Sequence, residues 1–211
     1  MGRPSQRGEQ RRGEHLRRHV LFTAKDVFLE AGYERASMDT VAARAGTSKR
    51  SLYAHFESKD KLFLAVLDLV RELYLDNLGT PDAYADEPAE AVALFCGRFL
   101  QLVTWEPQVR ICRLSIAAAG RLPASAVAYH DAMFASTHGR LTAYLTERWG
   151  LPDAAAPAGD LLTRAVLPRL FRTLLAVDEP ISREAAPGEA ALTDDVDLAA
   201  IRDLVRAVLP A

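Results

Sequence analysis

Residues 37–61 read SMDTVAARAGTSKRSLYAHFESKDK, and this stretch decides the fold that we expect. Ser37 and Ser48 each precede a short run with apolar positions at helical spacing, and serine is a preferred helix N-cap. The tripeptide Ala45-Gly46-Thr47 between the two runs predicts a tight turn. Two short helices joined in this way form a helix-turn-helix, which is stable only when a further helix packs behind it.

Supporting helices are predicted on both sides of this motif. Upstream, apolar residues recur at helical spacing until Gly32, a suitable C-cap; they are Leu16, Val20, Ala24, Val27, Phe28 and Ala31. Downstream, Ser58 caps a fourth helix whose apolar positions are Leu62, Leu64, Ala65, Leu67 and Leu69. The sequence therefore predicts a three-helix head that is joined through this fourth helix to the rest of the chain.

The remainder of the chain is predicted to be helical throughout. Beyond a loop over residues 79–88, we expect helices at 89–104, 107–119, 123–149, 159–176 and 195–209. Residues 152–158 and 184–191 are predicted loops, and Pro168 predicts either a kink in the helix at 159–176 or a later start for it. The expected fold class is all-α, with a three-helix head, a larger helical bundle and about nine helices in total.

Charge is distributed unevenly along the chain. Residues 1–61 contain 13 Lys and Arg against 8 Asp and Glu, whereas residues 62–211 contain 13 against 20. All four lysines lie in the first of these stretches. A cationic head on an acidic body suits a protein of which only one end approaches a polyanion.

Several classes of protein are not expected. No apolar run reaches the roughly 20 residues of a membrane span, and the basic N-terminus lacks the apolar segment of a secretory signal. We therefore expect a cytoplasmic protein with no membrane partner. Cys96 and Cys112 fit no metal-ligand spacing and are expected to be buried apolar positions. Because no nucleophile elbow, phosphate-binding glycine loop or metal motif is present, we expect no enzyme activity, no cofactor and no metal.

The second short helix of this motif holds the polar side chains that are candidates for binding. Polar side chains occupy the turn and the first half of this helix: Thr47, Ser48, Lys49, Arg50 and Ser51. A helix that enters the major groove of DNA, which is roughly 12 Å wide, presents such side chains to base edges from its N-terminal half. Arg50 can pair with a guanine or grip the phosphate backbone, and the sequence leaves both roles open.

These residues resemble the TetR family of transcription regulators. The motif is a first helix that ends in Gly-Tyr, followed by Ala-x-x-Ala-Gly-x-Ser-x-x-x-Leu-Tyr-x-His-Phe-x-x-Lys. It is carried here by Ala42, Ala45, Gly46, Ser48, Leu52, Tyr53, Phe56 and Lys59, and the resemblance covers residues 16–65. Two positions depart from the family pattern, since Arg50 replaces a frequent glycine and Thr47 replaces a common valine.

The resemblance implies a set of DNA-binding residues and a division into domains. Tyr53, His55 and Lys59 would contact phosphates, residues 47–51 would read bases, and Ser37 and Thr40 complete the candidate set. Phosphate contacts of this kind position a protein on DNA without reading its sequence. The expected domains are a flexible basic arm over 1–13, a DNA-binding domain over 14–61 and a ligand-binding and dimerisation domain over 62–211.

The N-terminal arm is rich in arginine. Its positive charges come from Arg3, Arg7, Arg11, Arg12, Arg17 and Arg18, against Glu9 and Glu14. Arginine is favoured in a narrow minor groove, so the arm is interpreted either as a minor-groove contact or as a solubilising tail.

The middle helices contain aromatic residues with polar residues among them. The candidate ligand contacts are Phe95, Phe99, Leu102, Trp105, Arg113, His130, Phe134, His138 and Phe171. This composition suits a largely apolar pocket with a few orienting polar groups, and each residue has core packing as its alternative. His130, Phe134 and His138 follow one another at a spacing of four residues and share one helix face. The Gly120-Arg121-Leu122-Pro123 run is the part of this region that resembles a TetR-type C-terminal domain.

The last two predicted helices are the candidate dimer surface. One apolar stripe holds Leu198, Ile201, Leu204, Val205 and Val208, and the other holds Leu161, Leu162, Val166, Leu170, Leu174 and Leu175. Packing within one chain is the alternative, and the resemblance favours a homodimer.

The predicted function is that of a regulator, in most TetR proteins a repressor. Such a repressor leaves a palindromic DNA operator when a small, largely apolar effector binds. The alternatives are an activator, or a ligand-binding protein of the same fold that does not bind DNA.

Overall fold

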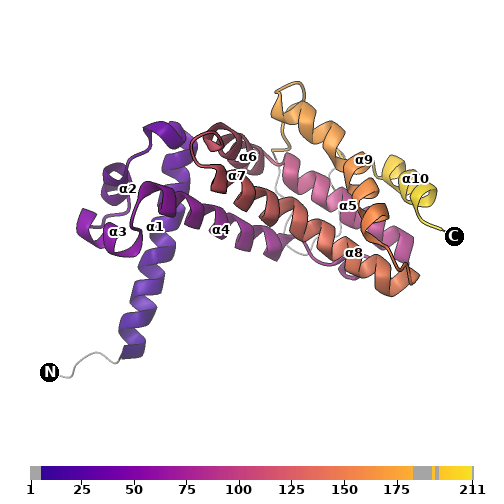
Figure 1. The fold of residues 1–211 in the computed structure, drawn as a ribbon, viewed down its shortest axis with the longest axis horizontal. Helices are drawn as coiled ribbons and strands as arrows, with labels where there is room; N and C mark the ends of the chain where they lie inside the picture. Colours follow the sequence, from indigo (N-terminus) through magenta and orange to yellow (C-terminus); the bar gives the residue numbers. More distant parts are fainter. Residues whose placement is uncertain (1–5, 183–191, 193–194, 211) are drawn as a thin grey trace. The chain divides into compact units, whose positions relative to one another are not determined.

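The computed structural model of the chain describes residues 6–182, 192 and 195–210 (Figure 1). The chain divides into two compact units. We call residues 1–70 and 114–129 the head unit, and residues 71–113 and 130–211 the bundle unit. The predicted boundary after residue 61 differs from this division, because residues 114–129 belong to the unit that contains the helix-turn-helix.

The head unit contains the predicted helix-turn-helix. Its helices are α1 (Gln6–Arg35), α2 (Met38–Arg44), α3 (Lys49–His55) and the first part of α4 (Lys59–Asn77). The three predicted serine caps are confirmed: the backbone amides of Thr40, Ser51 and Lys61 donate to the hydroxyls of Ser37, Ser48 and Ser58 at 3.1, 3.0 and 3.2 Å. The turn between α2 and α3 passes through Gly46 at a φ of 61°, a conformation that favours glycine.

Aromatic rings fill the interior of the head unit. Phe28 and Phe63 are fully buried with ring centroids 4.9 Å apart, and Tyr33 lies 5.1 Å from Phe63. The apolar side of α3 contributes Leu52, which is buried completely. The short helices are therefore held by a core that includes α1 and α4.

The predicted flexible arm is wrong over residues 6–13. α1 begins at Gln6, so these residues continue the helix, and residues 1–5 lie outside the described part of the chain. Glutamine, arginine and glutamate are good helix formers, and extending an existing helix needs no new nucleus. The predicted stop at Gly32 is a local break, with φ 75° and ψ 162°, after which the helix runs on to Arg35.

The bundle unit is built around α5 (Pro88–Thr104). This helix packs against α9 (Ala155–Leu174) and α10 (Leu198–Val208), and α8 (Ser136–Trp149) packs against α9. The first part of α6 (Glu106–Ala118) also belongs to this unit, whereas the end of α6 and nearly all of α7 (Pro123–His130) belong to the head unit. Pro81–Ala83 form a short 3-10 turn in the predicted loop. The predicted helix positions are confirmed to within a few residues, except at the start of α9.

The helix predicted over residues 123–149 contains a π-helical segment. α7 is followed directly by this segment, Asp131–Ala135, and then by α8. The hydroxyl of Ser136 donates to the Asp131 carbonyl at 2.8 Å, five residues back along the chain. π-segments are rare and occur often at functional sites.

α9 starts earlier than predicted. It begins at Ala155, so the loop prediction is wrong for residues 155–158, and a later start because of Pro168 is wrong too. Pro157 falls in the first turn, where a helix leaves its backbone N–H groups without internal partners. The helix also passes through Pro168.

The described residues contain neither a β-sheet nor a membrane-spanning helix. In the parts of the chain that the structure describes, the one β-type pairing is an isolated bridge between Trp105 and Ile181. Among the same residues, no helix combines the length and apolar character needed to cross a membrane. The predicted loop at 184–191 lies outside the described residues.

Candidate nucleic-acid interface and pocket

The polar residues predicted to read DNA gather at the start of α3. Ser48, Lys49 and Arg50 are exposed, and Thr47 is half-buried in the turn. The Ser48 hydroxyl accepts a hydrogen bond from the Ser51 amide, so it is engaged as the helix cap. Lys49 and Arg50 therefore supply the positive charge at this end of the helix.

Lys49 and Arg50 differ in their partners. The Lys49 ammonium lies 2.8 Å from Asp39 Oδ1, and hydrogen bonding to this carboxylate raises the lysine pKa. Within the described part of the chain, Arg50 forms no ion pair or side-chain hydrogen bond. A free guanidinium is ready to bind phosphate or guanine, whereas Lys49 must first release Asp39.

Tyr53 and His55 lie on the outer side of α3. Tyr53 is 41% exposed and His55 is also exposed, whereas Leu52 and Phe56 point into the core. Tyr53 is therefore a surface residue and not part of the core. Both side chains are accessible to a phosphate backbone.

Lys59 has a structural role that differs from the predicted one. Its ammonium donates to the backbone carbonyls of Tyr33 and Glu34 at 3.0 and 3.2 Å and lies 4.6 Å from the centre of the Tyr33 ring. The lysine thus neutralises the end of α1, where carbonyls carry partial negative charge. This arrangement does not support a phosphate contact by the Lys59 side chain.

Neighbouring groups reinforce the junction at Lys59. The Tyr33 hydroxyl donates to Asp60, and burial followed by this hydrogen bond raises the pKa of Tyr33 to about 12. Arg121, which precedes α7, lies 3.6 Å from Glu34. Sequence reasoning gave Arg121 no partner, because the contact spans most of the head unit's sequence.

Ser37 and Thr40 are exposed at the start of α2. Their hydroxyl oxygens lie 2.9 Å apart, and the Ser37 hydroxyl also accepts the Thr40 amide. The structure therefore assigns Ser37 a capping role, while the Thr40 hydroxyl stays on the surface.

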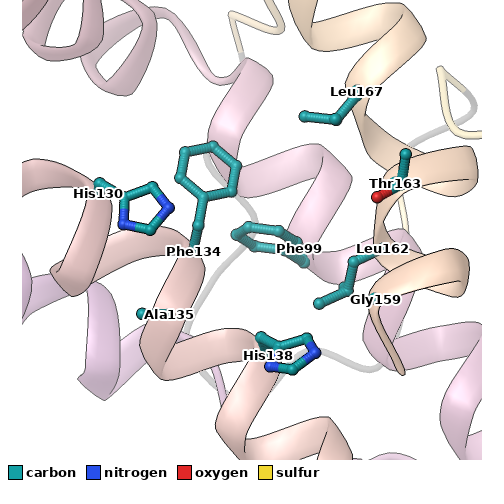
Figure 2. Close-up of a pocket in the computed structure, with 9 residues that line it drawn as sticks. All are labelled: Phe99, His130, Phe134, Ala135, His138, Gly159, Leu162, Thr163 and Leu167. Atoms are coloured by element: carbon teal, nitrogen blue, oxygen red, sulfur yellow. The ribbon is translucent and has the colours of Figure 1, made fainter. Parts of the chain in front are cut away.

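The bundle unit contains a cavity of about 340 Å³. Its lining comes from α5, from the π-segment and its flanks, and from α9; the residues are Phe99, His130, Phe134, Ala135, His138, Gly159, Leu162, Thr163 and Leu167 (Figure 2). Four of these, Phe99, His130, Phe134 and His138, were predicted ligand contacts. Of the lining residues on α9, Leu162 was interpreted as part of a dimer surface, and Gly159, Thr163 and Leu167 were given no role.

Aromatic rings dominate one side of this cavity. The Phe134 ring meets Phe99 edge-on at 5.7 Å and lies nearly parallel to the His130 ring at 6.1 Å. The His138 Nε2 lies 2.9 Å from the Ala155 carbonyl oxygen, which ties α8 to the first turn of α9. The pocket is thus apolar in the middle, with imidazoles at its edges (Figure 2).

The head resembles known bacterial regulators. The model of the family described as "Bacterial regulatory proteins, tetR family" matches residues 20–66. The transcriptional activator FasR of Mycolicibacterium smegmatis is 46% identical over 76 residues, which are 34% of this chain and 33% of FasR. The DNA-binding transcriptional repressor TetR of Mycobacteroides abscessus is 42% identical over 57 residues, or 27% of this chain and 30% of that protein.

Solved structures extend the similarity over nearly the whole chain. A TetR-family transcriptional regulator from Mesorhizobium loti gives a TM-score of 0.75 at 22% identity, covering 94% of this chain and 96% of that one. The flavonoid-responsive regulator FrrA gives 0.72 at 25% identity, covering 92% and 93%. Residues 20–66 thus match the TetR family, and the chain shares the fold of TetR-type regulators. The four proteins named here are all described as regulators.

The similarity to TetR proteins is strongest where the helix-turn-helix lies. The chain spans about a third of the length of the curated relatives that it matches, 33% and 30%. Residues 20–66, which match the family model, lie in the head unit, so the ligand and partners of the bundle unit follow only from its own residues.

Five of the predicted ligand contacts do not line this cavity. Phe95 is fully buried beside Tyr84, and Leu102 and Trp105 do not line the cavity. The Arg113 guanidinium donates to the carbonyls of Thr173 and Leu174 at 2.7 and 3.1 Å, so it caps the end of α9. Phe171 is 64% exposed. The structure therefore does not bring these five residues to the cavity, because composition alone does not tell which face of a helix borders it.

The two cysteines behave as predicted. Cys96 and Cys112 are free thiols and are buried, and burial raises the pKa of Cys96 to about 12. In the described part of the chain, no group of three or more His, Cys, Asp and Glu side chains is arranged to hold a metal ion.

Proposed function

We propose that the chain is a sequence-specific DNA-binding transcriptional regulator that acts as a repressor. The observation that carries the proposal is the outer surface of α3, where Arg50 has no partner among the described residues and Tyr53 is 41% exposed. Phenol and guanidinium groups at the start of a helix suit phosphate and base contacts. Residues 20–66, which match the TetR family model, contain this surface.

Dimerisation through α9 and α10 is part of this proposal. Five of the eleven residues first assigned to the dimer surface pack inside the chain: Leu161, Val166 and Leu170 of α9 and Ile201 and Val205 of α10 are buried. An exposed apolar ridge remains on α9, formed by Leu167, Phe171 and Leu175 at 44%, 64% and 60% exposure. An exposed ridge of this kind supports pairing with a second copy in a four-helix arrangement.

The cavity of the bundle unit is the proposed effector site. A ligand that binds one conformation better than another shifts the population, and DNA affinity changes by the same coupling free energy. The similarity to FrrA, described as flavonoid-responsive, supports a small-molecule effector. The direction of the response is open to an alternative, because FasR is described as an activator.

The test of DNA binding is selection of sites from random duplex DNA by the purified chain. We expect a palindrome with half-sites about one helical turn apart. The double variant Arg50→Ala/Tyr53→Ala should enrich nothing, whereas Arg148→Ala, which removes an exposed arginine of the bundle unit, should behave as wild type. Equal enrichment by the double variant, or no enrichment by wild type at low salt, would contradict the proposal.

The test of dimerisation is the molar mass in solution from light scattering. Phe171→Asp places a charge on the α9 ridge and should convert the dimer into a monomer. Val127→Asp is the matched control, because Val127 is a 59% exposed apolar residue in α7. The interface assignment fails if Phe171→Asp keeps the mass of the wild type.

Repression and activation are separated by a reporter gene placed behind the selected site. A repressor lowers expression when the chain is present, and addition of the effector restores it. Higher expression in the presence of the chain would favour the activator.

A further inference from the structure

We propose that the pocket of the bundle unit binds a hydroxylated planar aromatic molecule, a phenol whose hydroxyl donates a hydrogen bond to Nε2 of His130. This inference rests on the proposed effector site and adds the chemical class of the effector. The supporting observations are the volume of the cavity, the aromatic rings that line it and the hydrogen bonds of its two histidines.

The volume of the cavity and the absence of charged residues in its lining limit the class of ligand that fits. The cavity holds about 340 Å³, which is near the lower end of small-molecule pockets, roughly 300–1,000 Å³. None of the nine described residues that line it is Asp, Glu, Lys or Arg. A highly charged ligand such as a nucleotide would find no counter-ion there, so a compact and largely apolar ligand fits best.

The rings of the pocket favour a flat ligand. Phe134 lies between Phe99, which it meets at 78°, and His130, which is tilted from it by 27°. A ligand ring in this space can stack on one wall while it meets another edge-on, as aromatic pairs prefer. Leu162 and Leu167 of α9 close the other side with flexible aliphatic groups (Figure 2).

The hydrogen bonds of His130 fix which of its nitrogens carries the proton. Nδ1 lies 3.2 Å from the Asp131 carboxylate, which can only accept a hydrogen bond, so Nδ1 is the donor. In the neutral ring, Nε2 is then an acceptor. The side chain is 67% exposed, so a ligand can reach this nitrogen. Nε2 of His130 therefore suits a ligand that donates a hydrogen bond to it.

His138 uses one ring nitrogen to join α8 to α9. Its Nε2 lies 2.9 Å from the Ala155 carbonyl, which again can only accept, so this N–H is already used, and in the neutral ring Nδ1 remains as the acceptor. A Cβ atom at Gly159 would lie only 3.6 Å from the same nitrogen, which shows how closely α8 and α9 approach at this end.

Thr163 supplies the second polar group of the pocket. Its hydroxyl lies on the α9 side, across the pocket from His130 (Figure 2). Among the described residues it has no hydrogen-bond partner. Because a hydroxyl both donates and accepts, Thr163 pairs with either a second hydroxyl or a carbonyl of the ligand.

An aromatic carboxylate is the competing class. Its oxygens only accept hydrogen bonds, so it would not satisfy Nε2 of a neutral His130. Matched probes separate the two classes: β-naphthol donates, its methyl ether has the same rings without the donor, and the matching naphthoic acid carries the carboxylate.

The experiment is calorimetric titration of the full chain with these three probes. Wild type should bind β-naphthol about fivefold to tenfold more tightly than the ether, the size expected for one net hydrogen bond. His130→Phe keeps an aromatic wall and should bind both probes equally. His15→Phe, at an exposed histidine of α1, should retain the preference of wild type.

A second arm tests Thr163. A dihydroxynaphthalene with hydroxyls on both rings should bind more tightly than β-naphthol to wild type and no more tightly to Thr163→Val. Equal binding of naphthol and ether to wild type, tighter binding of the naphthoate, or no binding of any probe would overturn the inference. Selection of sites from random DNA is carried out in parallel. If the chain binds DNA there but fails the ligand tests, the proposed function stands and only the class of the ligand is overturned.

Discussion

The helix-turn-helix of the head unit is stabilised by bonds between residues close in the sequence, whereas the bundle unit is stabilised by bonds between residues far apart in it. In the head, the serine caps bond residues three positions away, as Ser37 does with Thr40 and Ser48 with Ser51. In the bundle, side chains reach across long stretches of sequence, and Arg113 contacts the carbonyl of Thr173 sixty positions later. The helix-turn-helix is therefore specified by local rules, whereas the bundle and its pocket depend on how distant helices meet.

The largest expected effect on stability compares the tightly packed core of the head unit with the cavity of the bundle unit. Phe63→Ala empties a fully buried position and should lower the free energy of unfolding by about 3–5 kcal/mol. Phe134→Ala should cost clearly less, because Phe134 is half-buried and already borders a cavity. Urea unfolding of both variants measures the two losses. Equal losses would mean that the pocket is packed as tightly as the head.

An intermediate effect tests the local rule at the turn. Gly46 has a φ of 61°, so Gly46→Ala forces a left-handed residue and should cost about 1–2 kcal/mol. Gly139 is a matched control inside α8, with no atom within 4 Å of an added Cβ, and Gly139→Ala should be neutral or slightly stabilising. Thermal unfolding midpoints compare the two. If both alanines behaved alike, backbone conformation at the turn would not matter.

The smallest effect tests a long-range bond of the bundle. The Arg202 guanidinium donates to Glu90 at 2.5 and 2.7 Å and joins α10 to α5, and this hydrogen bond lowers the pKa of Glu90. A carboxylate whose pKa is lowered in the folded state stabilises the fold above its unfolded pKa, and this stability is lost as the pH falls through the folded value. Glu90→Gln should therefore lower stability at neutral pH, and the difference from wild type should vanish in acid.

The size of this pH effect is expected to be small, below about 1 kcal/mol, because the Arg202 side chain is 42% exposed. Asp160→Asn is the control, since Asp160 pairs with Arg164 one turn away in the same helix. A difference between wild type and Glu90→Gln that persists unchanged at low pH would refute the assigned role of the carboxylate.

The sequence allowed the helix-turn-helix to be predicted almost residue by residue. Caps, a glycine turn and apolar spacing each act within a few positions, so Ser37, Gly46 and Ser48 could be assigned without knowing the rest of the fold. The partners of Lys59 could not be predicted in this way. Its partners are carbonyls of Tyr33 and Glu34, about 25 positions earlier, and only the packing of α1 against α4 brings them together.

The pocket could be predicted only in part. His130, Phe134 and His138 share a helix face, and that spacing made them visible in the sequence. Thr163 and Leu162 were not foreseen, because their place opposite Phe134 depends on how α9 docks against α5 and α8. The π-segment at Asp131–Ala135 also has no sequence signature that spacing reveals.

The central claim is that a dimer of this chain presents two copies of α3 to DNA. Hydroxyl-radical footprinting of the selected duplex tests it most directly. The account predicts two protected regions on one face of the DNA, separated by about one helical turn, and their loss in the Arg50→Ala/Tyr53→Ala variant. A single protected region, or protection that the double variant retains, would contradict it.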